Sequence, residues 1–167
     1  MSKIANTIKE KRSKLDLIPK HEIIFQVLDR LNRINKGNYS TEYLEFIVSS
    51  TMNFVEKLKS CKTEDDIVNL IVQMTNISND EQQPSRKATL IQLGSMALMS
   101  NVVVDYADHD WKEITSEISS HSGIRALNYE CAKCHSLGFI PHWLSDKTQI
   151  FCSVGCLESS AALVINS

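Results

Sequence analysis

The sequence contains few glycine, proline and aromatic residues, and it has no long hydrophobic run. Five glycines and three prolines among 167 residues supply too few turns for an all-β fold. The longest uncharged run covers residues 88–104 and is interrupted by polar side chains, whereas a membrane-spanning helix needs about 20 predominantly apolar residues. We therefore expect this run to form a buried helix, in a mainly helical protein with no membrane partner.

The chain also lacks a strong net charge and a secretory signal. Its 18 Lys and Arg residues and 20 Asp and Glu residues give a formal net charge of −2, so no global positive field points to nucleic acid. The basic N-terminal segment has no apolar core of the kind that export requires. Four of the five cysteines lie in residues 131–167, unlike the cysteines of an oxidised secreted protein. We expect a cytoplasmic location.

Residues 1–122 carry apolar side chains at helical spacing and predict a body of consecutive helices. Helix starts are indicated by capping residues and by proline, and helix ends by glycine and proline. Thr63 and Asp66 have the spacing of a capping box. The expected boundary residues are Pro19, Gly37, Ser40 or Thr41, Thr63 with Asp66, and Pro84.

The last part of this body is expected to contain its most buried helix. That helix begins near Pro84 and is expected to reach about Tyr106, because its apolar residues cover nearly every face. A short amphipathic segment around Ile114 and Ile118 follows and ends at Gly123.

After Gly123 the pattern changes to short β-type segments at residues 124–129, 138–141 and 149–151, with a closing helix over residues 157–165. The predicted fold is therefore mainly α, a multi-helix body with a small C-terminal module of β-hairpin and helix that binds zinc. The predicted domains are a helical body, 1–122, and the zinc module, 123–167, packed on it.

The strongest chemical signal is two pairs of cysteines near the C-terminus. CAKC begins at Cys131, and CSVGC begins at Cys152 after a 17-residue spacer. Two closely spaced pairs can supply four thiolates to one tetrahedral Zn²⁺ site, which has no open position for water and is structural. The predicted zinc ligands are Cys131, Cys134, Cys152 and Cys156.

These residues resemble the FCS-type treble-clef zinc fingers, which include the MYM/TRASH-like modules. The likeness covers residues 129–160 only. It implies a treble-clef-like fold and contacts with proteins or nucleic acids rather than catalysis. The matching residues are Cys131 and Cys134 as the knuckle, and Phe151, Cys152, Ser153 and Cys156 at the helix entry.

Several alternatives remain open at this stage. His135 stands where such knuckles often have glycine, and histidine tolerates the left-handed backbone that the position needs. His135 or His142 could replace one cysteine ligand, since Cys₃His zinc sites are common. An iron–sulfur cluster would use the same thiolates, and the CxxCH string at Cys131 also matches a c-type haem attachment signal. Cys61 is interpreted as a small hydrophobic residue near a helix end.

No catalytic pattern is present. The sequence has no glycine-rich phosphate loop and no nucleophile elbow. Its one HE pair lacks the second histidine of a metalloprotease motif. An acidic cluster around His109, made of Asp105, Asp108 and Asp110, is interpreted as a solvated helix end and turn in preference to a cation site. We therefore expect no enzymatic activity.

The sequence thus predicts a non-catalytic zinc-binding protein that acts as an adaptor or regulatory subunit, with another protein as its partner. Phe139 and Trp143 are candidate anchors for that partner, although burial in the module's own core is the favoured interpretation. The alternative is a nucleic-acid-binding transcription regulator, and homo-oligomers remain open. The candidate residues for phosphate or acidic-partner contact are Lys9, Lys11, Arg12 and Lys14.

Overall fold

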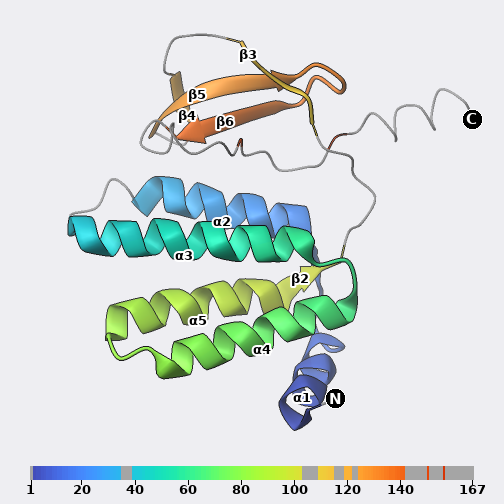
Figure 1. Ribbon diagram of the computed structural model, residues 1–167. Coiled ribbons are helices and arrows are strands. Elements are labelled where there is room, and N and C mark those ends of the chain that lie inside the picture. The colour runs from blue at the N-terminus through green and yellow to red at the C-terminus, as the bar shows by residue number, and fades with distance from the viewer. Residues whose placement is uncertain are drawn as a thin grey trace, which may run out of the picture. The chain divides into compact units, whose positions relative to one another are not determined.

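The computed structural model describes residues 2–34, 39–102, 109–114, 119–121, 124–141, 150 and 156. The chain divides into two units. Residues 1–27 and 38–104 form the helical unit, and residues 28–37 and 105–167 form the β unit. The helices and the small strands near the C-terminus confirm the mainly α fold with a small β module (Figure 1).

Five helices account for most of the part that the structure describes. Three of their starts agree with the sequence prediction. Ser40 accepts a hydrogen bond from the backbone N–H of Tyr43, Thr63 and Asp66 form the complete capping box, and Pro84 is the first residue of its helix. The helices are α1 (Lys3–Arg12), α2 (Lys20–Ile34), α3 (Thr41–Ser60), α4 (Glu64–Asp80) and α5 (Pro84–Met99).

Figure 1 shows α3, α4 and α5 side by side, with consecutive helices running in alternating directions. Their facing sides supply the apolar core of the helical unit. Helix α1 packs on α4 and α5. The core residues of α3, α4 and α5 that are at most 1% exposed are Phe54, Val55, Leu58, Ile67, Val68 and Ala97.

The predicted extent and depth of α5 are wrong. The helix ends at Met99, and Ser100–Asn101 forms strand β2, which pairs in parallel with β1 (Ile18–Pro19). Helix α5 is also not the most buried helix, since Ile91 is 50% exposed. Its apolar residues surround the helix, but α3, α4 and α1 do not cover its whole circumference.

The amphipathic segment expected around Ile114 and Ile118 is also not a helix in the residues that can be described. Trp111–Glu113 forms strand β3 and Ser119–His121 forms strand β4, and both pair with β5. Ile118 lies outside the described residues. Pairing with a strand later in the chain decides this conformation, and the local pattern does not contain that information.

Strand β5 (Ile124–Cys131) is the centre of the sheet. Strand β6 (Leu137–Pro141) pairs with one of its edges, while β3 and β4 pair with the two ends of its other edge. The strands predicted at residues 124–129 and 138–141 are thereby confirmed. Most of the predicted 149–151 strand and all of the closing helix over residues 157–165 lie outside the described residues.

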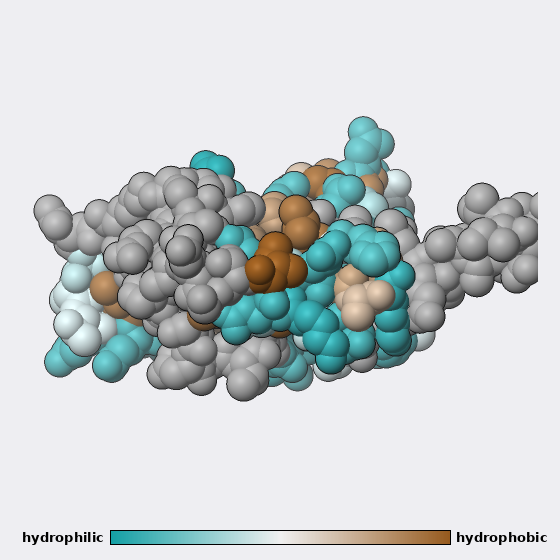
Figure 2. All heavy atoms as spheres, turned by 90° about the horizontal axis from the view of Figure 1, so that it is seen from above, coloured by the Kyte–Doolittle hydropathy of each residue, from teal (hydrophilic) through white to brown (hydrophobic). Residues whose placement is uncertain are grey.

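Exposed hydrophobic side chains are scattered over the described surface. In the view of Figure 2, hydrophobic residues occur in small groups among hydrophilic ones. Leu137 is the most exposed of the large ones, at 68%. No helix in the described ranges has both the length and the apolar character needed to cross a bilayer.

Candidate metal centre

Four potential metal ligands converge at one end of the sheet. The sulfur atoms of Cys131, Cys134 and Cys156 and a ring nitrogen of His109 all lie within 4.8 Å of one another. Cys131 and Cys156 are fully buried, while Cys134 and His109 are partly exposed. Three thiols and an imidazole are donors that suit Zn²⁺ and other soft or borderline transition metals.

Two of the separations are close to those between the ligands of a single tetrahedral ion. The Sγ atoms of Cys131 and Cys156 are 3.9 Å apart, and Cys134 Sγ is 3.3 Å from His109 Nδ1. Zinc–sulfur and zinc–nitrogen bonds of ordinary length give sulfur–sulfur edges of about 3.8 Å and sulfur–nitrogen edges of about 3.6 Å in a regular tetrahedron. The four residues could therefore hold one metal ion.

The turn between β5 and β6 forms the first half of the centre. The backbone N–H of Cys131 donates to Ser136 O at 2.9 Å, and the N–H of His135 donates to Cys131 O at 2.9 Å. His135 has a φ of 62°, which confirms the left-handed backbone expected at this position. This tight turn places the thiols of Cys131 and Cys134 on the same side.

Backbone N–H groups also stabilise the thiolate form of Cys131. Burial by itself would raise the pKa of this thiol, but backbone N–H groups of Cys134, Lys133 and Asp110 donate to the sulfur and lower the pKa to about 7. Hydrogen bonds to the charged form favour that form. Since the thiolate is the form that binds metals, the turn favours the reactive state of Cys131.

The register between β3 and β5 brings His109 to the same place. Trp111 lies opposite Cys131 in the antiparallel pair, and the N–H of Ala132 donates to Asp110 O at 2.8 Å just beyond the end of the strand. His109 therefore lies beside the turn between β5 and β6. Its ring lies 4.3 Å from the Trp111 ring, measured between centroids.

Gly138 makes room for this arrangement. A Cβ atom at Gly138 would lie 2.9 Å from the Trp111 ring and 2.7 Å from Ile150 Cγ2. Real Cβ atoms do not approach other atoms so closely, so a side chain here would displace Trp111. The absence of a side chain at Gly138 thus helps to hold β3, and with it His109, against the turn.

The structure brings three of the four predicted ligands together and does not describe the fourth. Cys131, Cys134 and Cys156 belong to the cluster, whereas Cys152 lies outside the described residues, as does His142. The His135 side chain is 76% exposed and lies 3.4 Å from a carboxylate oxygen of Glu130. His135 is therefore a surface residue and not a member of the cluster.

The structure describes one of the two candidate aromatic anchors. Phe139 is only 3% exposed, which agrees with the favoured interpretation that it is a core residue. Trp143 lies outside the described residues.

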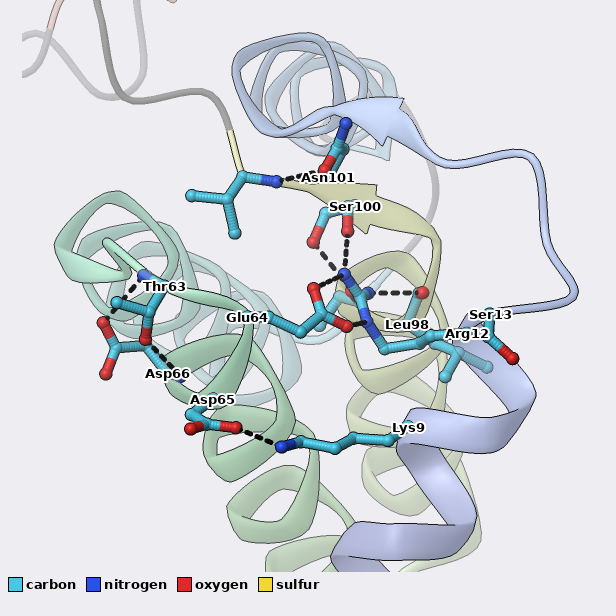
Figure 3. Close-up of polar contacts among 12 residues, drawn as sticks. Lys9, Arg12, Ser13, Thr63, Glu64, Asp65, Asp66, Leu98, Ser100 and Asn101 are labelled. Atoms are coloured by element: carbon cyan, nitrogen blue, oxygen red, sulfur yellow. Dashed lines mark hydrogen bonds and ion pairs between the residues drawn. The ribbon is translucent and has the colours of Figure 1, made fainter.

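Two of the four candidate basic residues, Lys9 and Arg12, bind acidic residues of α4 within the helical unit. Lys9 pairs with Asp65 at 2.5 Å and Lys14 lies 3.4 Å from Glu10. Lys11 is exposed. Arg12 is 1% exposed and binds Glu64 (Figure 3). Arg12 is thus a buried structural residue, and its expected availability to a phosphate or an external acidic partner is contradicted.

His109 is the member of the cluster that sequence reasoning missed. In the sequence it belongs to an acidic cluster that is expected to form a solvated helix end and turn, because acidic residues collect at such places. Only the pairing of β3 with β5 brings it to the cysteines. The one indication in the sequence that His109 precedes a strand is Trp111, a residue type enriched in strands, two positions later.

Comparison of the chain with protein-family models, curated proteins and solved structures finds no match.

Proposed function

We propose that this chain is a non-catalytic zinc-binding protein whose metal ion stabilises a surface for contact with another protein. The observation that carries the proposal is the set of four soft donors within 4.8 Å of one another. A module with few strands and a small core gains folding free energy from such an ion.

Zinc fits the donor set better than the other cofactors. An iron–sulfur cluster places sulfides between its irons and spreads its ligands more widely than a single ion does. Four donors so close together favour a mononuclear site. Haem attachment through Cys131 and Cys134 would leave the adjacent Cys156 thiol, 3.9 Å from Cys131 Sγ, without a role.

A structural role for zinc follows from the number of ligands. Catalytic zinc sites have three protein ligands and an open position for water, whereas four protein ligands fill the tetrahedron. Two of the ligands are fully buried, which also restricts access by a substrate. The ion would therefore hold the turn, His109 and Cys156 together rather than activate water.

A protein partner is favoured over nucleic acid because the basic helix is used internally. Arg12 and Lys9 bind acidic residues of α4, which leaves Lys11 on α1 and Lys14 just after it as the candidate phosphate contacts. Two lysines give a shallow dependence of binding on salt. A steep salt dependence of DNA or RNA binding would instead favour the alternative, a nucleic-acid-binding transcription regulator.

The first test is the metal content of the intact protein. Native mass spectrometry combined with elemental analysis is expected to find a single zinc ion per chain. The double variant Cys131→Ala/Cys156→Ala is expected to lose it, because half of the ligands are removed. Cys61→Ala is the matched control, since Cys61 is an equally buried thiol in the helical unit.

Retention of zinc by the double variant, or its loss from the Cys61→Ala control, would contradict the proposed site. Iron or covalently bound haem in the wild type would contradict the choice of metal.

A further inference from the structure

We propose that the fourth ligand of the metal is His109, so that the set of four donors is complete without Cys152. This inference rests on the proposed function, because it assigns the ligands of the same metal. The site would then be of the Cys₃His type, with Cys131, Cys134 and Cys156 as the thiolates. It would differ from the four-cysteine site that the spacing of the cysteines suggests.

The position of His109 is fixed by contacts of the next residue, Asp110, and of its own ring. Residue Asp110 is tied to the turn twice, since its N–H donates to Cys131 Sγ at 3.3 Å and its carbonyl accepts from Ala132 at 2.8 Å. The ring itself packs on Trp111. The imidazole is thus held beside Cys134 Sγ, with Nδ1 at 3.3 Å, close to the separation of about 3.6 Å between a sulfur and a nitrogen ligand of one zinc ion.

The charge of the site favours the same assignment. A neutral imidazole in place of a fourth thiolate leaves the zinc complex with one negative charge fewer. Burial of charge is costly unless the charge is compensated, and the groups that donate to Cys131 Sγ include the backbone N–H groups of Lys133 and Asp110, which carry no full charge. A Cys₃His site carries less negative charge and therefore needs less compensation.

This assignment changes which part of the chain the metal organises. With four cysteines, the ion would link only residues from 131 onward. With His109, it also fastens the chain just before β3 to the β5–β6 turn, and so secures the register in which Trp111 lies opposite Cys131. Removal of the metal should therefore change the environment of Trp111, whose ring is 4.3 Å from the ligand ring.

Cobalt(II) substitution distinguishes the two ligand sets. The protein is purified, its zinc is replaced by Co²⁺, and the thiolate-to-cobalt charge-transfer absorption is recorded per bound ion. This absorption grows with the number of thiolates. For Cys152→Ala we expect wild-type intensity and unchanged affinity, whereas for Cys156→Ala we expect about one third of the intensity to be lost, since one of the three thiolates that bind cobalt in the Cys₃His site is removed.

Two substitutions at His109 complete the test. His109→Ala is expected to weaken Co²⁺ and Zn²⁺ binding by at least about tenfold, since even residues that only support ligands cost 10–100-fold. His109→Cys is expected to restore binding with a charge-transfer intensity above that of the wild type. His135→Asn is the matched control, because His135 is an exposed histidine of the same turn and asparagine also tolerates its backbone.

A loss of charge-transfer intensity in Cys152→Ala would overturn the inference, as would wild-type affinity in His109→Ala or a failure of His109→Cys to restore binding. In those cases the metal is still bound by the wild type, and the proposed function stands. Absence of metal from the wild type would overturn the proposed function and this inference together.

Discussion

Arg12 uses all five of its N–H donors inside the helical unit. Two donate to the carboxylate of Glu64, at 2.7 and 2.9 Å. The other three donate to the carbonyls of Ala97, Leu98 and Ser100, where α5 ends (Figure 3). A guanidinium can satisfy these groups together because its donors form a rigid planar fork. Arg12 thereby joins the start of α4 to the end of α5.

Substitution of Arg12 by lysine tests this role while keeping the charge. An ammonium group has three donors on one atom and cannot reach both the carboxylate and the three carbonyls. We expect Arg12→Lys to lower the free energy of unfolding by about 2–4 kcal/mol, since breaking a buried pair costs 3–5 kcal/mol and Glu64 is half exposed. Urea unfolding followed by circular dichroism measures the change.

Lys11→Ala is the control for Arg12→Lys. Lys11 is exposed on the same helix, so its removal should change the free energy of unfolding by no more than about 0.5 kcal/mol. Equal effects of the two substitutions would show that Arg12 does not connect α4 and α5.

Helix starts depend on neighbouring residues and could be predicted, whereas some helix ends depend on distant ones. Thr63 and Asp66 are three residues apart, and their capping box was visible in the sequence. The end of α5 depends on Arg12, which lies in α1 and far away along the chain. Lys20 at the start of α2 likewise donates to Cys61 O at the end of α3. Such pairings have no local signature.

The residues of the candidate metal centre could likewise be predicted only where their signal is local. The CxxC spacing revealed Cys131 and Cys134, and the second pair of cysteines supplied Cys156. His109 could not be found, because its position depends on the register of β3 against β5. A single residue of shift between these strands would move Trp111 to the other face of the sheet and His109 away from the thiols.

Glu64, at the start of α4, should make the helical unit less stable at acidic pH. The hydrogen bond from Arg12 holds the pKa of Glu64 below its ordinary value of 4.5; burial opposes this shift, and the charges of Arg12 and Lys9 add to it. The folded state therefore favours the carboxylate. Its stabilising effect is complete above about pH 4.5 and is lost as the pH falls through the lowered pKa of the folded state.

We therefore expect Glu64→Gln to flatten the loss of stability on acidification. The difference in unfolding free energy between wild type and variant should be largest near neutral pH and shrink toward pH 3, as measured by urea unfolding at a series of pH values. Glu10→Gln is the control, because Glu10 is 71% exposed and pairs only with an exposed lysine at 3.4 Å. An unchanged difference across this range would contradict the role of the Glu64 carboxylate.

At the scale of the whole molecule, the two units differ in what stabilises them. The helical unit has a continuous apolar core, with Phe54, Val55 and Leu58 at most 1% exposed. The proposed metal ion contributes a larger share of the stability of the β unit, since the sheet consists of strands of three to eight residues. Both tryptophans, Trp111 and Trp143, belong to the β unit. Tryptophan fluorescence therefore reports on that unit alone, and helical circular dichroism reports mainly on the other.

Chelation should separate these two signals. A strong zinc chelator is expected to change the tryptophan fluorescence, because the ring of Trp111 lies 4.3 Å from that of His109 and folding of a small metal module depends on its ion. The helical signal at 222 nm should remain, since the core of the helical unit contains no proposed ligand. Addition of excess zinc should reverse the fluorescence change, and Cys131→Ala/Cys156→Ala should show the chelated spectrum from the start. Simultaneous loss of both signals at the same chelator concentration would instead mean that the ion stabilises the two units as one cooperative structure.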